Sequence, residues 1–559
     1  MASLSFLVFV LASLVGQVTS SSGQPIVSLG YGTFQGNTTG GVTEFLGIPY
    51  AKPPLGLLRF APPQAPVKTS GVRQATTFGA ACPQQLSVIP NVLPFQISAG
   101  PGPASVSEDC LFINVVVPAN ISSTTKLPVL FWIYGGGFGT GDGSANPGDA
   151  IVQRSITLGE PIIYVSSNYR VNAFGFLASK EAKAAGSTNS GILDQRFAMQ
   201  WVQSHISAFG GDPSKVTIWG ESAGALSVGL HLVIDHGNPG GLFRGAIMES
   251  GGPYTLRDVS AAQPYYDQLV EETGCSKSKD TLTCLREAPY NTLLAAINNT
   301  PSVFNFTSLN LAWQPRIDGS LFTENPQKSV ALGQYARVPL LAGDCDDEGT
   351  VFSLSSVNIT TNAEFLGYLK SNYYPTASPS EMAVIGQVYP DDPTQGAPFL
   401  TGDENELTPQ FKRISAFQGD YIFQGPRRFL YQFASRTQPT WGYLFKRFKA
   451  TPFLGSFHGS DISEFYTTPG VTDPGSPPDF IGTDALVNFV TSLDPNAKRN
   501  LPANISYLST VTWAQYGSNP FAPPLLTFND PEPTFNFTTD TYRQAAMAAI
   551  TALSLKEFP

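Results

Sequence analysis

Short apolar runs and helix-like segments alternate through the first half of the chain. Between Val129 and Ser250 the apolar runs are rich in β-branched residues, and they include Ile162–Ser166, Val216–Trp219 and Gly245–Glu249. Continuous apolar runs of this length are typical of strands that are buried on both faces. Because such strands alternate with helices, the pattern predicts a sheet covered by helices, which is a doubly wound α/β fold.

Three stretches rich in proline and glycine interrupt this pattern. They cover residues 90–103, 388–398 and 469–482. Proline and glycine favour turns over helices and strands. We therefore expect surface loops at these positions and not linkers between domains, and we find no internal repeat and no long run of one charge.

The run Val216–Trp219 leads directly into the most informative motif. Gly220–Gly224 reads Gly-Glu-Ser-Ala-Gly and matches the G-x-S-x-G pattern, in which a serine stands at a sharp turn from strand to helix. Glycines beside such a turn lack a Cβ and let the strand and the helix approach closely. The motif predicts that Ser222 is a nucleophile with an exposed hydroxyl.

Four histidines are available to activate this serine, because a hydroxyl needs a neighbouring base to take its proton. His231 and His236 lie along or beyond the helix that follows the elbow, and His205 lies at the opposite end of the strand. His458 lies in a glycine- and serine-rich loop after the strand-like run Trp441–Phe448. We expect His458 to be the base and the other three to be structural or solvated.

A third group has to orient the imidazole, and chain order places this acid between the serine and the histidine. An acidic loop follows the apolar run Val338–Ala342 and contains Asp344, Asp346, Asp347 and Glu348. Glu348 fits best, but spacing alone does not distinguish it from the other three acids. An acidic loop is also typical of solvated surface.

A glycine-rich segment offers donors for a developing oxyanion. Gly135–Gly139 follows the strand-like run Pro128–Tyr134, and its backbone N–H groups are not covered by side chains. Phosphate binding is the competing interpretation. The spacing opposes it, because residues 135–143 contain neither G-x-G-x-x-G nor a following G-K-[ST].

Beyond these features, the chain resembles the type-B carboxylesterase/lipase family, which includes fungal lipases, carboxylesterases and cholinesterases. The similarity extends over nearly the whole mature chain. The matching segments, beside the elbow, are Phe45–Ala51 (FLGIPYA), Leu58–Phe60 (LRF), Glu108–Val115 (EDCLFINV), Asn168–Val171 (NYRV) and Leu193–Gln195 (LDQ).

The resemblance implies a catalytic triad of Ser222 as nucleophile, His458 as base and Glu348 as the acid that orients it. It thereby selects one of the four acids that spacing leaves open. The family's oxyanion donors correspond to the backbone amides of Gly136, Gly137 and Ala223.

The family also implies an α/β-hydrolase fold, a doubly wound and mostly parallel sheet with large helical and loop insertions. The length of 559 residues alone would allow several domains, but the resemblance implies a single domain over residues 21–559. The chemistry of the triad needs no cofactor and no metal.

The composition bears on the compartment. Charged residues make up 13% of the chain, well below the roughly 25% usual in soluble domains, so we expect glycans to contribute to solubility. Seven Asn-x-Ser/Thr sequons are candidates for glycosylation: Asn37, Asn120, Asn298, Asn305, Asn358, Asn504 and Asn536.

The first twenty residues resemble a cleaved signal peptide. Leu4–Val15 is a short apolar run followed by small residues, and nowhere does the sequence contain eighteen consecutive apolar residues. A net charge of −10 argues against nucleic-acid partners and anionic membranes, which require a basic face. We therefore expect residues 1–20 to be a signal peptide and the protein to be secreted, without an integral membrane segment.

Five cysteines leave one unpaired if two bridges form. Cys275 and Cys284 form a plausible local bridge, and Cys82 with Cys110 is the second, since the family has bridges at both places. Cys345 remains, and we expect a buried free thiol there, because a cysteine nucleophile would need a base of its own.

The segment 82–110 carries apolar residues and almost no charge. In lipases of the family this region is the lid, so it is either a mobile flap over the acyl site or a fixed loop. Together these features predict a secreted serine carboxylic ester hydrolase acting on small-molecule or lipid esters. The alternatives are a lipase or sterol esterase with a mobile lid, a feruloyl-type esterase for plant hydroxycinnamoyl esters and, more distantly, a non-catalytic adhesion module. The oligomeric state is not predicted.

Overall fold

The computed structural model describes residues 24–97, 102–467, 479–497 and 501–558. The expected signal peptide, residues 1–20, lies outside the described residues. The proline- and glycine-rich stretches 90–103 and 469–482 lie only partly within them.

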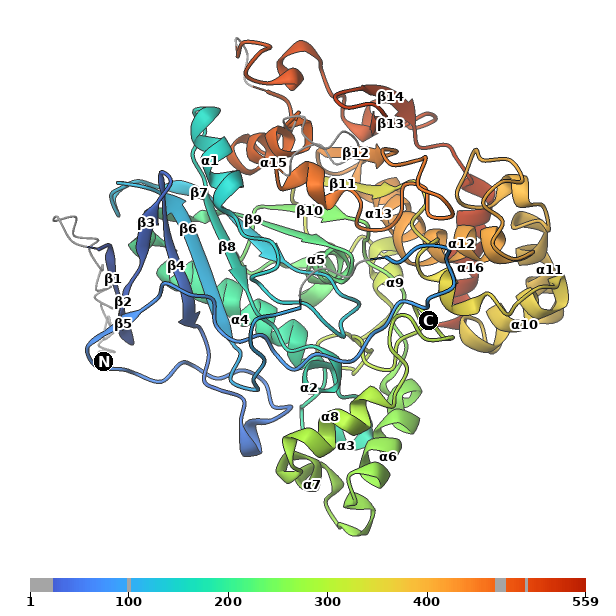
Figure 1. Cartoon of the computed structure of the whole chain (residues 1–559), viewed down its shortest axis with the longest axis horizontal. Helices are drawn as coiled ribbons and strands as arrows, with labels where there is room; N and C mark the ends of the chain where they lie inside the picture. The colour runs from blue at the N-terminus through green and yellow to red at the C-terminus, as the bar shows by residue number, and fades with distance from the viewer. Residues whose placement is uncertain (1–23, 98–101, 468–478, 498–500, 559) are drawn as a thin grey trace, which may run out of the picture.

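An 11-stranded sheet forms the centre of the molecule (Figure 1). Its strands are, in spatial order, β14 (Phe535–Thr539), β13 (Pro524–Phe528), β12 (Thr440–Phe445), β11 (Leu340–Cys345), β10 (Gly245–Glu249), β9 (Gly211–Glu221), β7 (Leu127–Ile133), β8 (Ile163–Ser167), β6 (Phe112–Pro118), β4 (Val42–Pro49) and β3 (Asn37–Thr39). From β8 to β13 every neighbouring pair is parallel, whereas the pairs at both edges are antiparallel. The sheet is mostly parallel, as predicted. A second, three-stranded sheet contains β1 (Ile26–Leu29), β2 (Gly32–Gln35) and β5 (Val72–Gln74).

The apolar runs explain the central strands. All residues of β8, β10, β11 and β12 are buried, as expected of parallel strands covered on both faces. The predicted strand Gly245–Glu249 has the predicted bounds, whereas β9 begins five residues before the predicted Val216. The prediction that the run from Trp441 continues to Phe448 is wrong, because β12 ends at Phe445 and Phe448 has a left-handed backbone with φ 69°.

Helices cover both faces of the sheet. The longer ones are α1 (Asp149–Thr157), α4 (Ser190–His205), α5 (Ala223–Val233), α6 (Gln263–Glu272), α7 (Thr281–Glu287), α8 (Tyr290–Asn298), α9 (Pro326–Ala331), α10 (Asn362–Asn372), α11 (Pro379–Val388), α12 (Phe411–Gly419), α13 (Gly425–Ala434), α15 (Ile481–Ser492) and α16 (Gln544–Glu557); the shorter ones are α2 (Asn172–Phe176), α3 (Lys180–Ala184) and α14 (Ile462–Phe465). Figure 1 shows α1 and α15 on one side of the sheet and α4 and α5 on the other. After β7 the chain forms β8 on one side of β7 and then crosses back to form β9 on the other side. This path makes the fold doubly wound and places a switch point beside β7.

Helical excursions surround this core. Helices α6, α7 and α8 form one group, and α10 and α11 pack near α16 in another (Figure 1). The loop predicted for residues 469–482 is wrong at its end, because α15 begins at Ile481, whose side chain is fully buried. The stretch 388–398 likewise begins with the last residue of α11.

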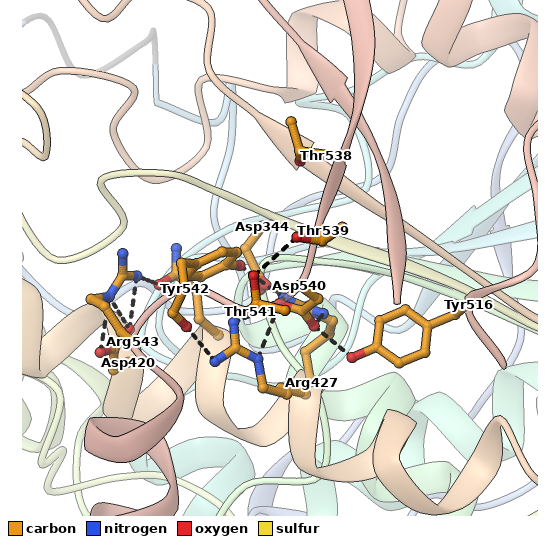
Figure 2. Close-up of polar contacts among 12 residues, drawn as sticks. Asp344, Asp420, Arg427, Tyr516, Thr538, Thr539, Asp540, Thr541, Tyr542 and Arg543 are labelled. Carbon is orange, nitrogen blue, oxygen red and sulfur yellow. Dashed lines mark hydrogen bonds and ion pairs between the residues drawn. The ribbon is translucent and has the colours of Figure 1, made fainter. Parts of the chain in front are cut away.

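A buried ionic network joins the C-terminal segment to the sheet and to α13 (Figure 2). We call it the arginine network; its members are Asp344, Asp420, Asp540, Arg427, Arg428 and Arg543. Arg427 links β11 to the residue that follows β14, since it lies 2.7 Å from the Asp344 carboxylate and 2.5 Å from that of Asp540. Tyr516 also donates a hydrogen bond to Asp540. The network fixes β11, which carries the acidic loop, against the last part of the fold.

Candidate active site

The serine motif forms the sharp turn that its sequence predicts. Ser222 lies between β9 and α5, with φ 55° and ψ −125°, which is a strained backbone for a residue with a side chain. A Cβ on Gly224 would lie 1.9 Å from the carbonyl oxygen of Ile133, and one on Gly220 would lie 2.4 Å from the backbone of Gly224. Both glycines are therefore required by the close approach of strand and helix.

His458 and Glu348 converge on this serine from loops after two other strands. Nε2 of His458 lies 2.7 Å from Oγ of Ser222, and its Nδ1 lies 2.6 Å from Oε2 of Glu348. The second carboxylate oxygen of Glu348 accepts a hydrogen bond from the backbone amide of Cys345 at 2.7 Å. The three side chains form a continuous chain of hydrogen bonds, which can carry a proton from the hydroxyl to the imidazole.

The other histidines lie away from this arrangement. His231 is fully buried in α5 and forms a hydrogen bond with Gln195. His205 packs against the rings of Tyr31 and Trp201, and His236 is an exposed residue outside the cavity. Their positions agree with the structural or solvated role expected for them.

The acidic loop after β11 is not solvated surface. Asp344 and Asp347 are fully buried, and Asp346 and Glu348 are 4% and 1% exposed. The surface interpretation of this loop is therefore wrong. Burial of four carboxylates is tolerated only where each has a partner.

These carboxylates do not all pair with the same group. Asp344 pairs with Arg427 at 2.7 Å, and Asp346 and Asp347 both pair with Lys449. Among the described acids of the loop, only the glutamate faces the imidazole. The structure thus distinguishes the four candidates that spacing left open.

Further carboxylates gather around the imidazole. We call them the catalytic acid cluster; its members are Glu221, Glu249, Glu348 and Asp461. Within the described residues, no lysine or arginine forms an ion pair with any of them. The cluster therefore has an excess of acidic groups in a buried setting.

Burial controls protonation in this cluster. It raises the pKa of Glu221 to about 8, with neighbouring carboxylates adding to the rise and His458 opposing it. Burial likewise raises the pKa values of Glu249, Glu348 and Asp461. It lowers the pKa of His458, whose ring stacks on Phe423 at 4.3 Å between ring centroids. The imidazole is consequently neutral at pH 7 and free to accept a proton at Nε2.

The glycine-rich segment lies beside the elbow. Strands β7 and β9 are parallel neighbours, and a Cβ on Gly135 would lie 2.9 Å from that of Ser222. Gly136 and Gly137 have φ values of 96° and 60°, which favour glycine. Ala223 begins α5, so its N–H group is among those without an intrahelical acceptor. All three expected oxyanion donors border the cavity described next.

A cavity of about 1000 Å³ opens over Ser222 and His458. The segment 82–110 covers part of it with apolar side chains: Leu86, Val88, Ile89 and Ile97. The Gln85 side chain helps to fasten this segment, because it donates to the carbonyl oxygens of Ile297 and Thr300. Residues 98–101 of the segment lie outside the described part of the chain.

The cysteines pair as the family resemblance implies. Cys82 is bonded to Cys110 and Cys275 to Cys284, and Cys345 is a buried free cysteine. Burial raises the pKa of the Cys345 thiol, with Asp461 and Glu348 adding to the rise. A thiol kept protonated is a poor nucleophile.

The seven sequons differ in exposure. Five asparagines are exposed, namely Asn120, Asn305, Asn358, Asn504 and Asn536. Asn37 and Asn298 are half-buried. Asn298 also borders the cavity, and its side-chain oxygen accepts a hydrogen bond from the Leu86 amide.

The described residues contain no cluster of three or more histidine, cysteine, aspartate or glutamate side chains suited to hold a metal ion. No helix among them combines the length and the apolar character needed to cross a bilayer.

Sequence reasoning missed the catalytic acid cluster apart from Glu348. Glu221 stands inside the motif, and its Oε1 lies 3.4 Å from Nε2 of His458. Glu249 is the last residue of the predicted strand β10 and accepts a hydrogen bond from the Trp219 indole. A carboxylate at the carboxyl end of a buried strand is the signal that would have marked both residues.

Known proteins share this sequence and architecture. Residues 23–545 match the family model of the carboxylesterase family. "Secreted lipase 1" of Botryotinia fuckeliana is 40% identical over 87% of this chain and 86% of its own length, and "Lipase 2" of Diutina rugosa is 42% identical over 81% and 84%. The crystal structure of Aspergillus niger EstA matches 96% of this chain and 100% of its own, with a TM-score of 0.81 and 30% identity. The fold is therefore that of the α/β-hydrolases, and the chain belongs to the carboxylesterase family of carboxylic ester hydrolases.

Proposed function

We propose that the chain hydrolyses carboxylic esters through an acyl-enzyme on Ser222. The hydroxyl attacks the ester carbonyl while His458 takes its proton, and the imidazolium then gives that proton to the leaving alcohol. Water, activated by the same imidazole, attacks the acyl-enzyme and releases the acid. The observation that carries the proposal is the hydrogen-bonded chain from Oγ of Ser222 through His458 to Glu348.

Two supporting groups complete this mechanism. Glu348 holds the imidazole in the tautomer whose Nε2 accepts a proton, and it stabilises the imidazolium. The backbone amides of Gly136, Gly137 and Ala223 stabilise the oxyanion. They border the cavity beside the serine, where donors fixed in advance act on developing charge without reorganisation.

Replacing the nucleophile tests the proposal. Ser222→Ala should lower kcat on p-nitrophenyl butyrate by at least about 10⁴-fold and should abolish labelling by an organophosphonate probe. The control Ser204→Ala changes an exposed serine on α4 and should leave both unchanged. Labelling of the Ser222→Ala protein, or near-normal turnover by it, would refute the assignment. Absence of labelling in the unmodified protein would favour the adhesion module.

We also propose that the protein is secreted as one domain, residues 21–559, after removal of residues 1–20. Two disulfides are typical of an oxidising compartment, and the relative from Botryotinia fuckeliana is named a secreted lipase. The expected glycans would lie on the sequons described above. The N-terminal sequence and glycosidase-sensitive mass of the protein from the culture medium test these expectations; an intact Met1 would contradict them.

A lipase with a mobile lid is the second candidate. The segment 82–110 places apolar side chains over the site, yet Leu86 and Val88 are each 65% exposed, which would favour contact with a lipid surface. Turnover of an emulsified triacylglycerol should then rise sharply above its solubility limit. A smooth saturation curve through that limit would support the simple esterase. Activity on feruloyl esters but not on triacylglycerols would support the feruloyl-type alternative.

A further inference from the structure

The wall of the cavity is mostly apolar, and Tyr254 and Gln314 are among the polar side chains that border it away from the triad. Tyr254 lies in the loop after β10, and Gln314 lies between α8 and α9. Their neighbours in the wall are apolar: Phe138, Leu226, Leu309 and Leu311. A few polar groups in an apolar pocket usually fix the orientation of a ligand.

The hydroxyl of Tyr254 has no hydrogen-bond partner among the described residues, although the residue is only 2% exposed. Gln314 is 6% exposed, and its side chain likewise forms no hydrogen bond within the described part of the chain. A buried polar group without a partner, such as the Tyr254 hydroxyl, lowers the stability of the folded protein. A ligand that supplies the partner removes that cost, so these groups point to something that binds there.

A buried cation reinforces the polar character of this region. Arg316 is 1% exposed, and it donates to the carbonyl oxygens of Leu311 and Ala312 while its Nε and Nη1 have no partner among the described residues. Burial lowers the pKa of Arg316 to about 10, so the group is charged at neutral pH. Burial raises the pKa of Tyr254, and the charge of Arg316 opposes the rise. The cation therefore strengthens the Tyr254 hydroxyl as a hydrogen-bond donor.

The position of these residues assigns them to the acyl part of an ester. Leu226 lies one turn along α5 from Ser222, and the ring of Phe138, next to Gly137, stacks on Tyr254 at 6.5 Å between centroids. The leaving alcohol has to depart beside His458, which gives it a proton. Tyr254 is not among the residues whose rings contact that imidazole. The region around Tyr254 is therefore available to the acyl group.

We propose that Tyr254 and Gln314 form a polar subsite that selects acyl groups carrying a hydroxyl or similar oxygen at a distance from the ester. The subsite rests on the proposed ester hydrolysis at Ser222. The Tyr254 hydroxyl donates to the substrate oxygen, and the Gln314 amide donates to it or accepts from it. Two classes of acyl group carry such a hydroxyl: hydroxylated aliphatic acids and hydroxylated aromatic acids.

Matched pairs of p-nitrophenyl esters test the subsite. One arm compares hydroxyacyl chains of about six to twelve carbons, a length suited to a pocket of this size, with their unsubstituted analogues. The other arm compares 3-(4-hydroxyphenyl)propanoate with 3-phenylpropanoate. In the unmodified protein, kcat/KM should favour the hydroxylated member of at least one pair by about tenfold, and the arm with the larger ratio identifies the source.

Substitutions show which side chains cause the preference for hydroxylated esters. Tyr254→Phe and Gln314→Leu should each reduce the ratio of the two kcat/KM values by about fivefold to tenfold. Tyr266→Phe is the matched control, since it also removes a tyrosine hydroxyl, but one bonded to Thr281 outside the cavity, and it should keep the ratio. A ratio of one in the unmodified protein, or a ratio that Tyr254→Phe leaves unchanged, overturns the subsite while ester hydrolysis stands. Failure to hydrolyse any ester of the panel overturns both proposals.

Discussion

The catalytic acid cluster and the arginine network are joined through one segment, because Asp344 is the second-last residue of β11 and Glu348 lies in the loop that follows it. Both are buried. In the arginine network three carboxylates face three guanidinium groups. In the catalytic acid cluster the only basic partner among the described residues is the imidazole of His458, which is neutral at pH 7.

This difference shifts the pKa values of Asp540 and Glu221 in opposite directions. Burial acts to raise the pKa of Asp540, but Arg427 and Arg428 outweigh it and hold the pKa below its ordinary value. Around His458 no opposing interaction outweighs burial, and Glu221 and Glu249 have raised pKa values. The fold thus holds charge with counter-charge where it needs rigidity, and it holds protons where a proton has to move. Ion pairs fix geometry, whereas groups with pKa values near neutrality respond to a change of charge on the imidazole.

The largest effect should follow from changing the acid that orients the imidazole. Glu348→Gln keeps the shape but presents an amide to Nδ1 of His458, which favours the wrong tautomer, and kcat should fall by about 10⁴-fold. Steady-state kinetics on p-nitrophenyl butyrate measure this. Asp346→Asn is the control from the same loop, where the carboxylate pairs with Lys449. If Glu348→Gln retained a tenth of the activity, the proposed role of the acid would be wrong.

The fold of this site was largely predictable from local sequence, whereas its acid could be selected only through the family resemblance. Gly245–Glu249 has its predicted bounds because every residue of the strand is buried, and the elbow follows from glycines that local packing requires. The four acids of the β11 loop were indistinguishable by spacing. Their partners, such as Arg427 and His458, lie about 80 to 110 residues away in the chain. The sequence of the loop alone therefore does not predict which acid contacts which partner.

The second effect should fall on stability and should arise in the arginine network. Arg427→Met leaves Asp344 and Asp540 buried without their shared partner, which should lower the free energy of unfolding by about 3 to 5 kcal/mol. Urea unfolding followed by tryptophan fluorescence measures it. Arg436→Met removes an exposed arginine just beyond α13 and should change stability by less than about 0.5 kcal/mol. Equal losses in the two variants would mean that the network contributes no more than a surface charge.

Asp540 and Glu221 should contribute to stability with opposite dependence on pH. The pKa of Asp540 is lowered in the folded state, so its contribution to stability is present above the unfolded value of about 3.9 and is lost as the pH falls below it. The pKa of Glu221 is raised to about 8, so its contribution is present below about 4.3 and is lost as the pH rises toward 8.

Glu221→Gln isolates the second dependence. The variant should be more stable relative to the unmodified protein at pH 8 than at pH 5, by about 1 to 3 kcal/mol. His458, Glu249, Glu348 and Asp461 face the same region and remain in both proteins, so the difference belongs to the substituted group. Unfolding in urea at each pH measures it. A relative stability that stays constant from pH 5 to 8 would place the pKa of Glu221 near its ordinary value.

The smallest effect should come from a carboxyl group whose environment disfavours its charge. Burial, with Asp461 adding to it, raises the pKa of Glu249 well above its ordinary value and so favours the uncharged form. Glu249→Gln preserves the oxygen that accepts from the Trp219 indole at 2.7 Å and should change the free energy of unfolding at pH 7 by less than about 1 kcal/mol. Asp344→Asn is its counterpart in the next strand, and there the loss of a carboxylate paired with Arg427 should cost about 2 kcal/mol or more. Were Glu249→Gln the more damaging of the two, this carboxylate would be ionised in the folded protein, and the contrast between a cluster that holds protons and a network that holds charge would fail.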